Sequence, residues 1–166
     1  MRIHRFLPLL LLTACGEKPA PPPAVPEPLK APAGEAVVAK ALASGVQIYE
    51  CKDQKWVLSG PDAELKNERG AKIGRHFKGP TWALDDGSSV VADVVGKSDA
   101  PAPNAVPWLL LKAKSTDGKG ALDRVTSIQR VDTSGGKAPA EACAAGDQTK
   151  VPYTATYYFY APEKRN

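Results

Sequence analysis

The sequence has few of the residue types, and none of the short motifs, on which many catalytic sites depend. Its 166 residues include only two histidines and three cysteines. No H-E-x-x-H or C-x-x-C motif occurs, and the glycine patterns that bind phosphates or dinucleotides are absent. Nucleotide-dependent chemistry is therefore disfavoured, and we expect no cofactor.

The chain also lacks a hydrophobic run long enough for a transmembrane helix, which needs about 20 apolar residues. Its short apolar run, Phe6–Leu12, follows a start that carries Arg2 and Arg5. A charged start followed by a short apolar run is typical of a signal peptide. Residues 1–14 are therefore predicted to be a signal peptide that is removed.

The residues at the cleavage site indicate which kind of signal peptide this is. Leu12-Thr13-Ala14-Cys15 resembles the lipobox of bacterial lipoproteins, in which the cysteine thiol receives a diacylglycerol. The resemblance implies lipidation at Cys15. Because Gly16 follows instead of an aspartate, it also implies an outer-membrane lipoprotein facing the periplasm or the cell surface. More than one acyl chain would anchor it stably. The alternative is an ordinary secretory signal with a chance cysteine.

The charge of the chain gives no indication of a nucleic-acid partner. The net charge of +4 falls to +2 once Arg2 and Arg5 leave with the signal peptide. The lysines between residues 52 and 78 are interleaved with acidic residues such as Glu64 and Glu68, as on a solvated surface. We therefore expect no nucleic acid to bind.

Two cysteines remain once Cys15 is committed to lipid. In an exported protein, Cys51 and Cys143 predict a disulfide. Closing a loop of roughly 90 residues would stabilise the fold by about 4 to 5 kcal/mol. The alternative is a metal site with His76, but two thiolates and one imidazole fall short of the four ligands of a structural zinc. We expect no metal.

Residues 15–34 contain the predicted lipidated cysteine followed by a proline-rich segment. Seven prolines lie between Gly16 and Gly34. Such a segment favours extended polyproline II structure and could span up to roughly 60 Å. We predict a semi-rigid stalk; a proline-motif ligand for a partner domain is the alternative.

Residues 35–166 are predicted to form a single all-β domain stapled by the disulfide. Strand patterns recur at short intervals, and the clearest turn is Asp86-Gly87, a dipeptide suited to a hairpin. The predicted strands are Val46–Cys51, Trp56–Leu58, Thr81–Leu84, Ser89–Val94, Trp108–Ala113, Val125–Val131 and Tyr153–Tyr160. The strand Trp108–Ala113 is a continuous apolar run and should be buried on both faces. About seven short strands predict an antiparallel β-sandwich or barrel, with one short helix between Glu35 and Ala43.

Several separated segments of this domain resemble the bacterial and fungal family known as DUF3455. The segments, in chain order, are Val46–Cys51, Trp56 with Gly60-Pro61, Ile73–Trp82, Asp86–Ser88, Pro107–Leu111, Val125–Val131 and Pro152–Tyr160. The resemblance implies a small exported protein without an assigned activity, so it supplies no mechanism.

His76 is the only histidine that remains after the predicted cleavage, and it is the obvious candidate acid or base. Asp86 and Asp93 are candidate carboxylate partners, although turn chemistry explains Asp86 equally well. Arg75 and Trp82 are close to His76 in sequence and are candidate ligand-binding residues. No serine or threonine lies in a recognised nucleophile motif. A structural role, with the imidazole hydrogen-bonded to a loop carbonyl, is the alternative for His76.

The last predicted strand carries aromatic residues on both faces. Tyr153, Tyr157 and Phe159 share one face, and Tyr158 and Tyr160 share the other. One face should belong to the core. If the other face is exposed, Tyr158 and Tyr160 with Trp82 or Trp108 would form a stacking platform for a sugar or an aromatic ligand.

Three functions follow from these observations. The leading hypothesis is a non-catalytic binding or structural lipoprotein of the cell envelope, whose partner is a small molecule, a glycan or an envelope protein. The second is an envelope hydrolase in which His76 is the base and Asp86 or Asp93 orients it. The third is a carbohydrate-binding module that uses the tyrosines and Trp82.

Overall fold

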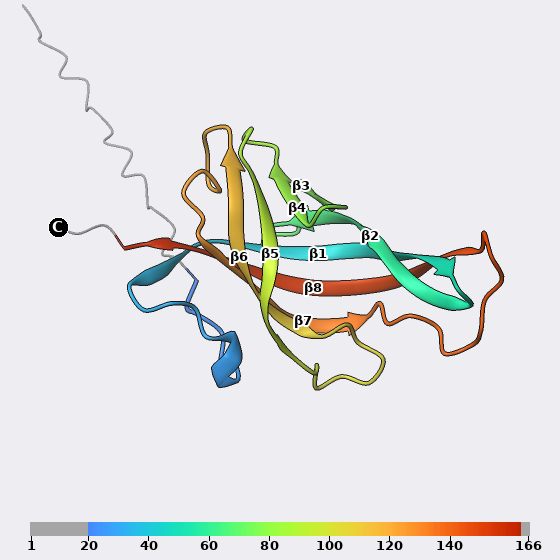
Figure 1. The fold of residues 1–166 in the computed structure, drawn as a ribbon. Coiled ribbons are helices and arrows are strands. Elements are labelled where there is room, and N and C mark those ends of the chain that lie inside the picture. The colour runs from blue at the N-terminus through green and yellow to red at the C-terminus, as the bar shows by residue number, and fades with distance from the viewer. Residues whose placement is uncertain (1–19, 164–166) are drawn as a thin grey trace, which may run out of the picture.

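The computed structural model describes residues 20–163, which form eight antiparallel strands and one turn of 3-10 helix. The elements are η1 (Glu27–Leu29), β1 (Glu35–Lys52), β2 (Lys55–Lys66), β3 (Lys72–Phe77), β4 (Thr81–Leu84), β5 (Ser89–Ser98), β6 (Trp108–Asp117), β7 (Ser127–Gly135) and β8 (Gln148–Pro162). Each strand pairs with the next, and β8 pairs with β1, so the sheet closes into a barrel (Figure 1). The predicted all-β antiparallel class is confirmed, and the barrel is one of the two expected architectures.

The main core lies inside the barrel, where alternate residues of each strand point. Small inward residues on β1 and β2 leave room for large rings from β4 and β8, a pairing of sizes typical of small barrels. The small residues are Ala41, Ala43 and Ala63, and the rings belong to Trp82, Tyr157 and Phe159. The side chains of these rings are almost completely buried.

One end of the barrel is closed by the loop between β6 and β7, which places the buried side chain of Leu122 in the core. The β4–β5 turn holds this loop. Asp86 accepts hydrogen bonds from the Ser88 hydroxyl (2.6 Å) and from the Ala121 amide (2.8 Å). The Ser88 hydroxyl in turn accepts the Leu122 amide at 3.1 Å. Turn and loop therefore form one structural unit, at the hairpin that the Asp86-Gly87 dipeptide predicts.

At the opposite end, the long connection between β7 and β8 is tied to the β1–β2 hairpin. The disulfide between Cys51 and Cys143 joins them, with 5.8 Å between the two Cα atoms. The Trp56 indole donates to the Glu141 carbonyl at 3.1 Å, and the Tyr49 hydroxyl donates to the Gly136 carbonyl at 2.7 Å. The predicted disulfide is confirmed, and it restrains the long connection between β7 and β8.

Two expectations about individual elements were wrong in position or extent. One short helix was expected near the N-terminus, and the structure has a single turn of 3-10 helix there, at η1. Residues 35–43, where we expected it, form the first half of β1. The alanines of this segment suit a helix, but β1 pairs with β8 along its length, and this tertiary pairing decides the structure. The strand β6, expected to be buried on both faces, alternates between buried Leu109 and Leu111 and exposed Lys112 and Lys114. One face of a barrel wall points outward.

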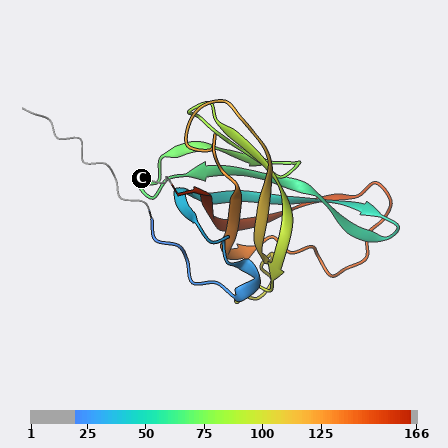
Figure 2. The same cartoon turned by 60° about the vertical axis from the view of Figure 1, so that its left-hand side comes forward.

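Residues 20–34, which we call the strap, run along the outside of the barrel to η1 and back to β1 (Figure 2). Leu29 is completely buried, and its carbonyl accepts a hydrogen bond from the Gln129 side chain at 2.6 Å. Val25 and Ala31 pack against the outer cluster of Val37, Val131, Tyr158 and Tyr160. The described part of the predicted stalk is therefore docked on the barrel and does not extend away from it.

Two other expectations concern membranes. Cys15, the predicted lipidation site, lies outside the described residues, as does the predicted signal peptide of residues 1–14. Across residues 20–163, no helix has the length and apolar character needed to cross a membrane.

Candidate ligand-binding site

A pocket of about 130 Å³ lies at the barrel end opposite the β6–β7 loop. We call it the inner pocket. Apolar residues form most of its wall, and five residues contribute hydrogen-bonding groups from β1, β3, β4, β7 and β8. The lining residues are Gln47, Leu58, Pro61, His76, Pro80, Trp82, Val94, Leu109, Leu111, Arg130 and Tyr157. All eight strands and the β3–β4 connection thus contribute to a single small cavity, which only the closed barrel brings together.

His76 reaches the inner pocket from β3, where it pairs with Trp82 of β4. Its ring stacks on the Trp82 indole, with the centroids 4.2 Å apart, and meets the Tyr157 ring edge-on at 5.1 Å. Nδ1 lies 2.8 Å from the Thr81 carbonyl oxygen. Because a carbonyl only accepts, Nδ1 carries the proton, which leaves Nε2 as an acceptor in the neutral ring.

The electrostatic environment keeps His76 neutral. Its side chain is 2% exposed, and burial is the main cause that lowers its pKa to about 3. The hydrogen bond to Thr81 opposes this shift, and the positive charge of Arg130 adds to it. A histidine with this pKa holds no proton on Nε2 at neutral pH and is a poor general base, since its affinity for a proton is low.

Several buried polar atoms around the inner pocket have no hydrogen-bond partner among residues 20–163. They are both side-chain polar atoms of Gln47, the Trp82 indole nitrogen and the hydroxyls of Tyr153 and Tyr157. Tyr153 lies two inward positions before Tyr157 on β8, with Ala155 between them, and the two hydroxyls are close enough to influence one another's pKa. An unsatisfied buried polar group costs about 1 to 3 kcal/mol. Such a concentration in one place calls for an explanation, and a bound polar ligand supplies one.

Arg130 supplies the positive charge of the inner pocket from β7. Its Nε and Nη2 atoms donate to the Pro107 carbonyl at 3.1 and 2.8 Å, which fixes the guanidinium group. No carboxylate of the described chain forms an ion pair with it. Burial raises the pKa of Tyr157, an effect that the charge of Arg130 opposes.

The carboxylates predicted to work with His76 lie elsewhere. Asp86 is bound to Ser88 and Ala121 at the closed end, where the Ala121 amide is the main cause that lowers its pKa. Asp93 is exposed on β5, with Lys114 Nζ at 4.0 Å. The Nδ1 atom that a catalytic carboxylate would bind is occupied by the Thr81 carbonyl. The structure does not bring His76 together with Asp86 or Asp93.

The other predicted ligand-binding residues divide between the two faces of the barrel. Trp82 joins His76 in the inner pocket, as their separation in sequence suggested. Arg75 lies on the opposite face of β3, where it is exposed and donates a hydrogen bond to Asp62 at 2.9 Å. Trp108 packs against the outer cluster that contains Tyr158 and Tyr160. The barrel wall therefore separates Trp82 from these tyrosines, and the strap covers the face that would have formed a stacking platform.

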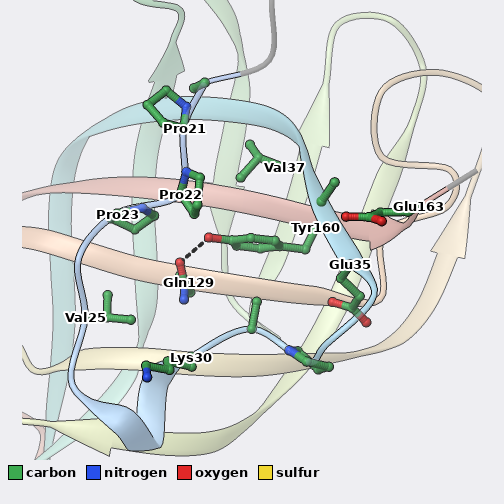
Figure 3. Close-up of a pocket in the computed structure, with 14 residues that line it drawn as sticks. Pro21, Pro22, Pro23, Val25, Lys30, Glu35, Val37, Gln129, Tyr160 and Glu163 are labelled. Carbon is green, nitrogen blue, oxygen red and sulfur yellow. Dashed lines mark hydrogen bonds between the residues drawn. The ribbon is translucent and has the colours of Figure 1, made fainter.

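A larger cavity of about 560 Å³ lies between the strap and the barrel wall, and we call it the outer cavity (Figure 3). Its central polar groups already have partners. The Tyr160 hydroxyl donates to Gln129 Oε1 at 2.5 Å, and Gln129 Nε2 donates to the Leu29 carbonyl. Glu35 accepts hydrogen bonds from the hydroxyls of Thr126 and Ser127. Burial raises the pKa of Tyr160 to about 12, so this hydroxyl keeps its proton. Although larger, the outer cavity shows less need for a polar ligand.

Sequence reasoning missed Gln47, Arg130, Tyr153 and Tyr157 as site residues. The available signal was polarity at an inward strand position. Gln47 shares a strand face with Tyr49 and Cys51, and Arg130 shares one with Ile128. A polar residue at a core-facing position departs from the usual pattern and calls for a functional or structural reason.

Comparison with known proteins adds a family and no activity. Neither the curated proteins nor the solved structures include a match to this chain. A family model described as "Protein of unknown function (DUF3455)" matches residues 32–161, a range that includes every residue lining the inner pocket. The chain, whose sequence already resembles this family in seven segments, belongs to the DUF3455 family.

Proposed function

We propose that this protein is a lipid-anchored protein of the bacterial cell envelope that binds a small molecule inside its barrel. The observation that carries the binding role is the group of unpartnered polar atoms on Gln47, Trp82 and Tyr157 around the inner pocket. Buried polar groups are normally hydrogen-bonded, and a small ligand would supply the missing partners. The role is non-catalytic.

The geometry around His76 supports binding over hydrolysis. A hydrolytic base must accept a proton near neutral pH, and burial lowers the pKa of His76 to about 3. Its Nδ1 atom is held by a backbone carbonyl, so the ring is fixed as an acceptor and a stacking surface. These properties suit a residue that orients a ligand.

The proposed anchor is the lipid on Cys15, for which the lipobox resemblance is the support. Cys15 precedes Ala20 by five residues, which an extended chain spans in at most about 18 Å. Because the strap is docked on the barrel from Ala20 onward, the lipid would hold the barrel close to the membrane surface. The proposed location is the outer membrane, facing the periplasm or the cell surface.

The binding role can be tested by extracting the full-length protein from cell envelopes and identifying small molecules released on denaturation by mass spectrometry. The Gln47→Leu variant removes two unpartnered atoms without a large change in volume, and Asp93→Asn is the matched surface control. We expect a compound to accompany the wild type and Asp93→Asn and to be depleted from Gln47→Leu. The proposal fails if no compound is recovered and no member of a panel of small polar molecules raises the melting temperature.

The anchor can be tested separately by labelling cells with radioactive palmitate. The wild-type protein should carry the label and sediment with outer membranes, and Cys15→Ser should carry none. Gly16→Asp provides a matched control, since it should keep the label while shifting the protein to the inner membrane. If the wild-type protein carries no label, the proposal of a lipid anchor on Cys15 is overturned, and the binding role is decided by its own test.

A further inference from the structure

We propose that the inner pocket binds a short-chain carboxylate and that Arg130 is its counterion. This inference deepens the proposed binding function and rests on it. Arg130 is the one charged residue among those that line the pocket. A partly buried cation with no carboxylate partner in the described chain is unfavourable, and an anionic ligand would compensate it.

The guanidinium group has hydrogen atoms left for a ligand. Two of its five N–H groups, on Nε and Nη2, point to the Pro107 carbonyl. That contact fixes the group's orientation and leaves its other N–H groups for an acceptor. Charge-assisted hydrogen bonds from arginine to carboxylates are among the stronger polar contacts in proteins.

The uncharged groups around the pocket complement a carboxylate. Gln47 Nε2, the Trp82 indole and the Tyr157 hydroxyl are donors without partners in residues 20–163. Burial raises the pKa of Tyr157, so its hydroxyl keeps the proton that it would donate. An ionised carboxylate only accepts hydrogen bonds, through two oxygens with about four lone-pair sites. The unpartnered donors of the pocket therefore match the acceptor sites of a carboxylate in kind.

The size and the apolar walls of the pocket limit the rest of the ligand. Its volume of about 130 Å³ is close to that of a cavity of about 150 Å³ known to take benzene, which has six heavy atoms. Leu109, Leu111 and Val94 line the remaining wall. These side chains suit a short alkyl chain better than the oxygens of an inorganic anion, which would need further donors.

The decisive experiment is isothermal titration of the full-length protein in detergent at pH 7 with butyrate and with the neutral, similarly shaped butyramide. We expect butyrate to bind at least tenfold more tightly than butyramide. Arg130→Gln should reduce the affinity for butyrate at least tenfold. Arg75→Gln is the matched control, because it removes the same charge from an exposed arginine paired with Asp62 and should leave the affinity unchanged.

A second variant keeps the test decisive if Arg130→Gln does not fold, which circular dichroism would show. Tyr157→Phe removes one hydroxyl and should weaken butyrate binding several-fold. The inference is overturned if butyramide binds as tightly as butyrate, if the folded Arg130→Gln or Tyr157→Phe variant binds butyrate normally, or if inorganic phosphate binds more tightly. If only neutral molecules bind, the inference that the ligand is a carboxylate is overturned, and the proposed binding function still stands. Absence of any small-molecule binding would overturn both.

Discussion

The inner pocket and the outer cavity lie on opposite faces of the same barrel wall, and both are lined by residues of β7 and β8. The outer cavity is about four times larger, at 560 against 130 Å³. Each contains a buried glutamine and a buried tyrosine. Outside, the Tyr160 hydroxyl donates to Gln129, and Gln129 donates to the Leu29 carbonyl of the strap. Inside, Gln47 and Tyr157 have no partner in residues 20–163.

This difference indicates what each cavity is for. Polar groups that serve a structural role are satisfied within the fold, because an unsatisfied one destabilises it. The paired glutamine of the outer face therefore belongs to the docking of the strap. The unpaired glutamine of the inner face is a destabilising feature that binding would explain. Volume alone would have favoured the outer cavity.

The largest expected effect concerns the outer face. Leu29→Ala should lower the free energy of unfolding by about 2 to 5 kcal/mol, because Leu29 is completely buried between the strap and the outside of the barrel and its truncation leaves a cavity. Urea denaturation measures this loss. Val38→Ala, at a half-exposed position of β1, is the control and should change the unfolding free energy by less than about 0.5 kcal/mol. Equal, small effects in both variants would mean that the strap contributes nothing to the fold.

The next effect concerns the inner face and depends on pH. The pKa of His76 is about 3 in the folded chain and close to its ordinary value of 6.5 when unfolded. Between these values only the unfolded chain takes up the proton. The stability contributed by neutral His76 is therefore complete above pH 6.5 and is lost as the pH falls towards 3.

His76→Phe keeps a ring against Trp82 and removes this titration. Between pH 7.5 and pH 4, the wild type should lose roughly 3 kcal/mol more unfolding free energy than the variant, since one pKa unit corresponds to about 1.4 kcal/mol. Urea denaturation at both pH values measures the difference. Carboxylates titrate in both proteins, so their contribution cancels. Parallel losses would show that His76 is not buried in its neutral form.

A smaller loss of stability is expected when Gln129, the hydrogen-bonded glutamine of the outer face, is replaced. Gln129→Leu removes a donor to the Leu29 carbonyl and an acceptor for the Tyr160 hydroxyl, and it leaves both atoms buried. We expect a loss of about 1 to 3 kcal/mol in unfolding free energy. Tyr160→Phe should recover part of that loss in the double variant, because it removes one of the two orphaned groups. No recovery would argue against the hydrogen bond between Tyr160 and Gln129.

The sequence predicted features that depend on neighbouring residues or on a single pairing. Asp86-Gly87 predicted the β4–β5 hairpin because the turn needs a positive φ, and Gly87 has a φ of +89°. Cys51 and Cys143 predicted the disulfide because no other pairing remained. Features that depend on distant contacts were missed. The alanines after Glu35 suit a helix, and pairing with β8 makes them a strand.

The candidate site was predicted only in part, for the same physical reason. His76 and Trp82 were found because they are scarce residue types close together in the sequence. Arg130 and Gln47 are 83 positions apart, and only closure of the barrel brings them into one pocket. Prolines indicated the extended character of the strap, but its docking depends on Val25 packing against an outer apolar cluster and on the burial of Leu29, which no local pattern reveals.

The smallest predicted effect is also the sharpest test of the contrast between the two faces. Gln47→Leu replaces an unpartnered amide by an apolar group of similar size, so the ligand-free protein should be unchanged or gain up to about 2 kcal/mol in unfolding free energy. The same substitution at Gln129 should destabilise, and urea denaturation of the two variants side by side compares them directly. If both lose stability equally, Gln47 has a structural partner after all. If Gln47→Leu gains stability and loses ligand, this glutamine is kept for binding at the expense of stability.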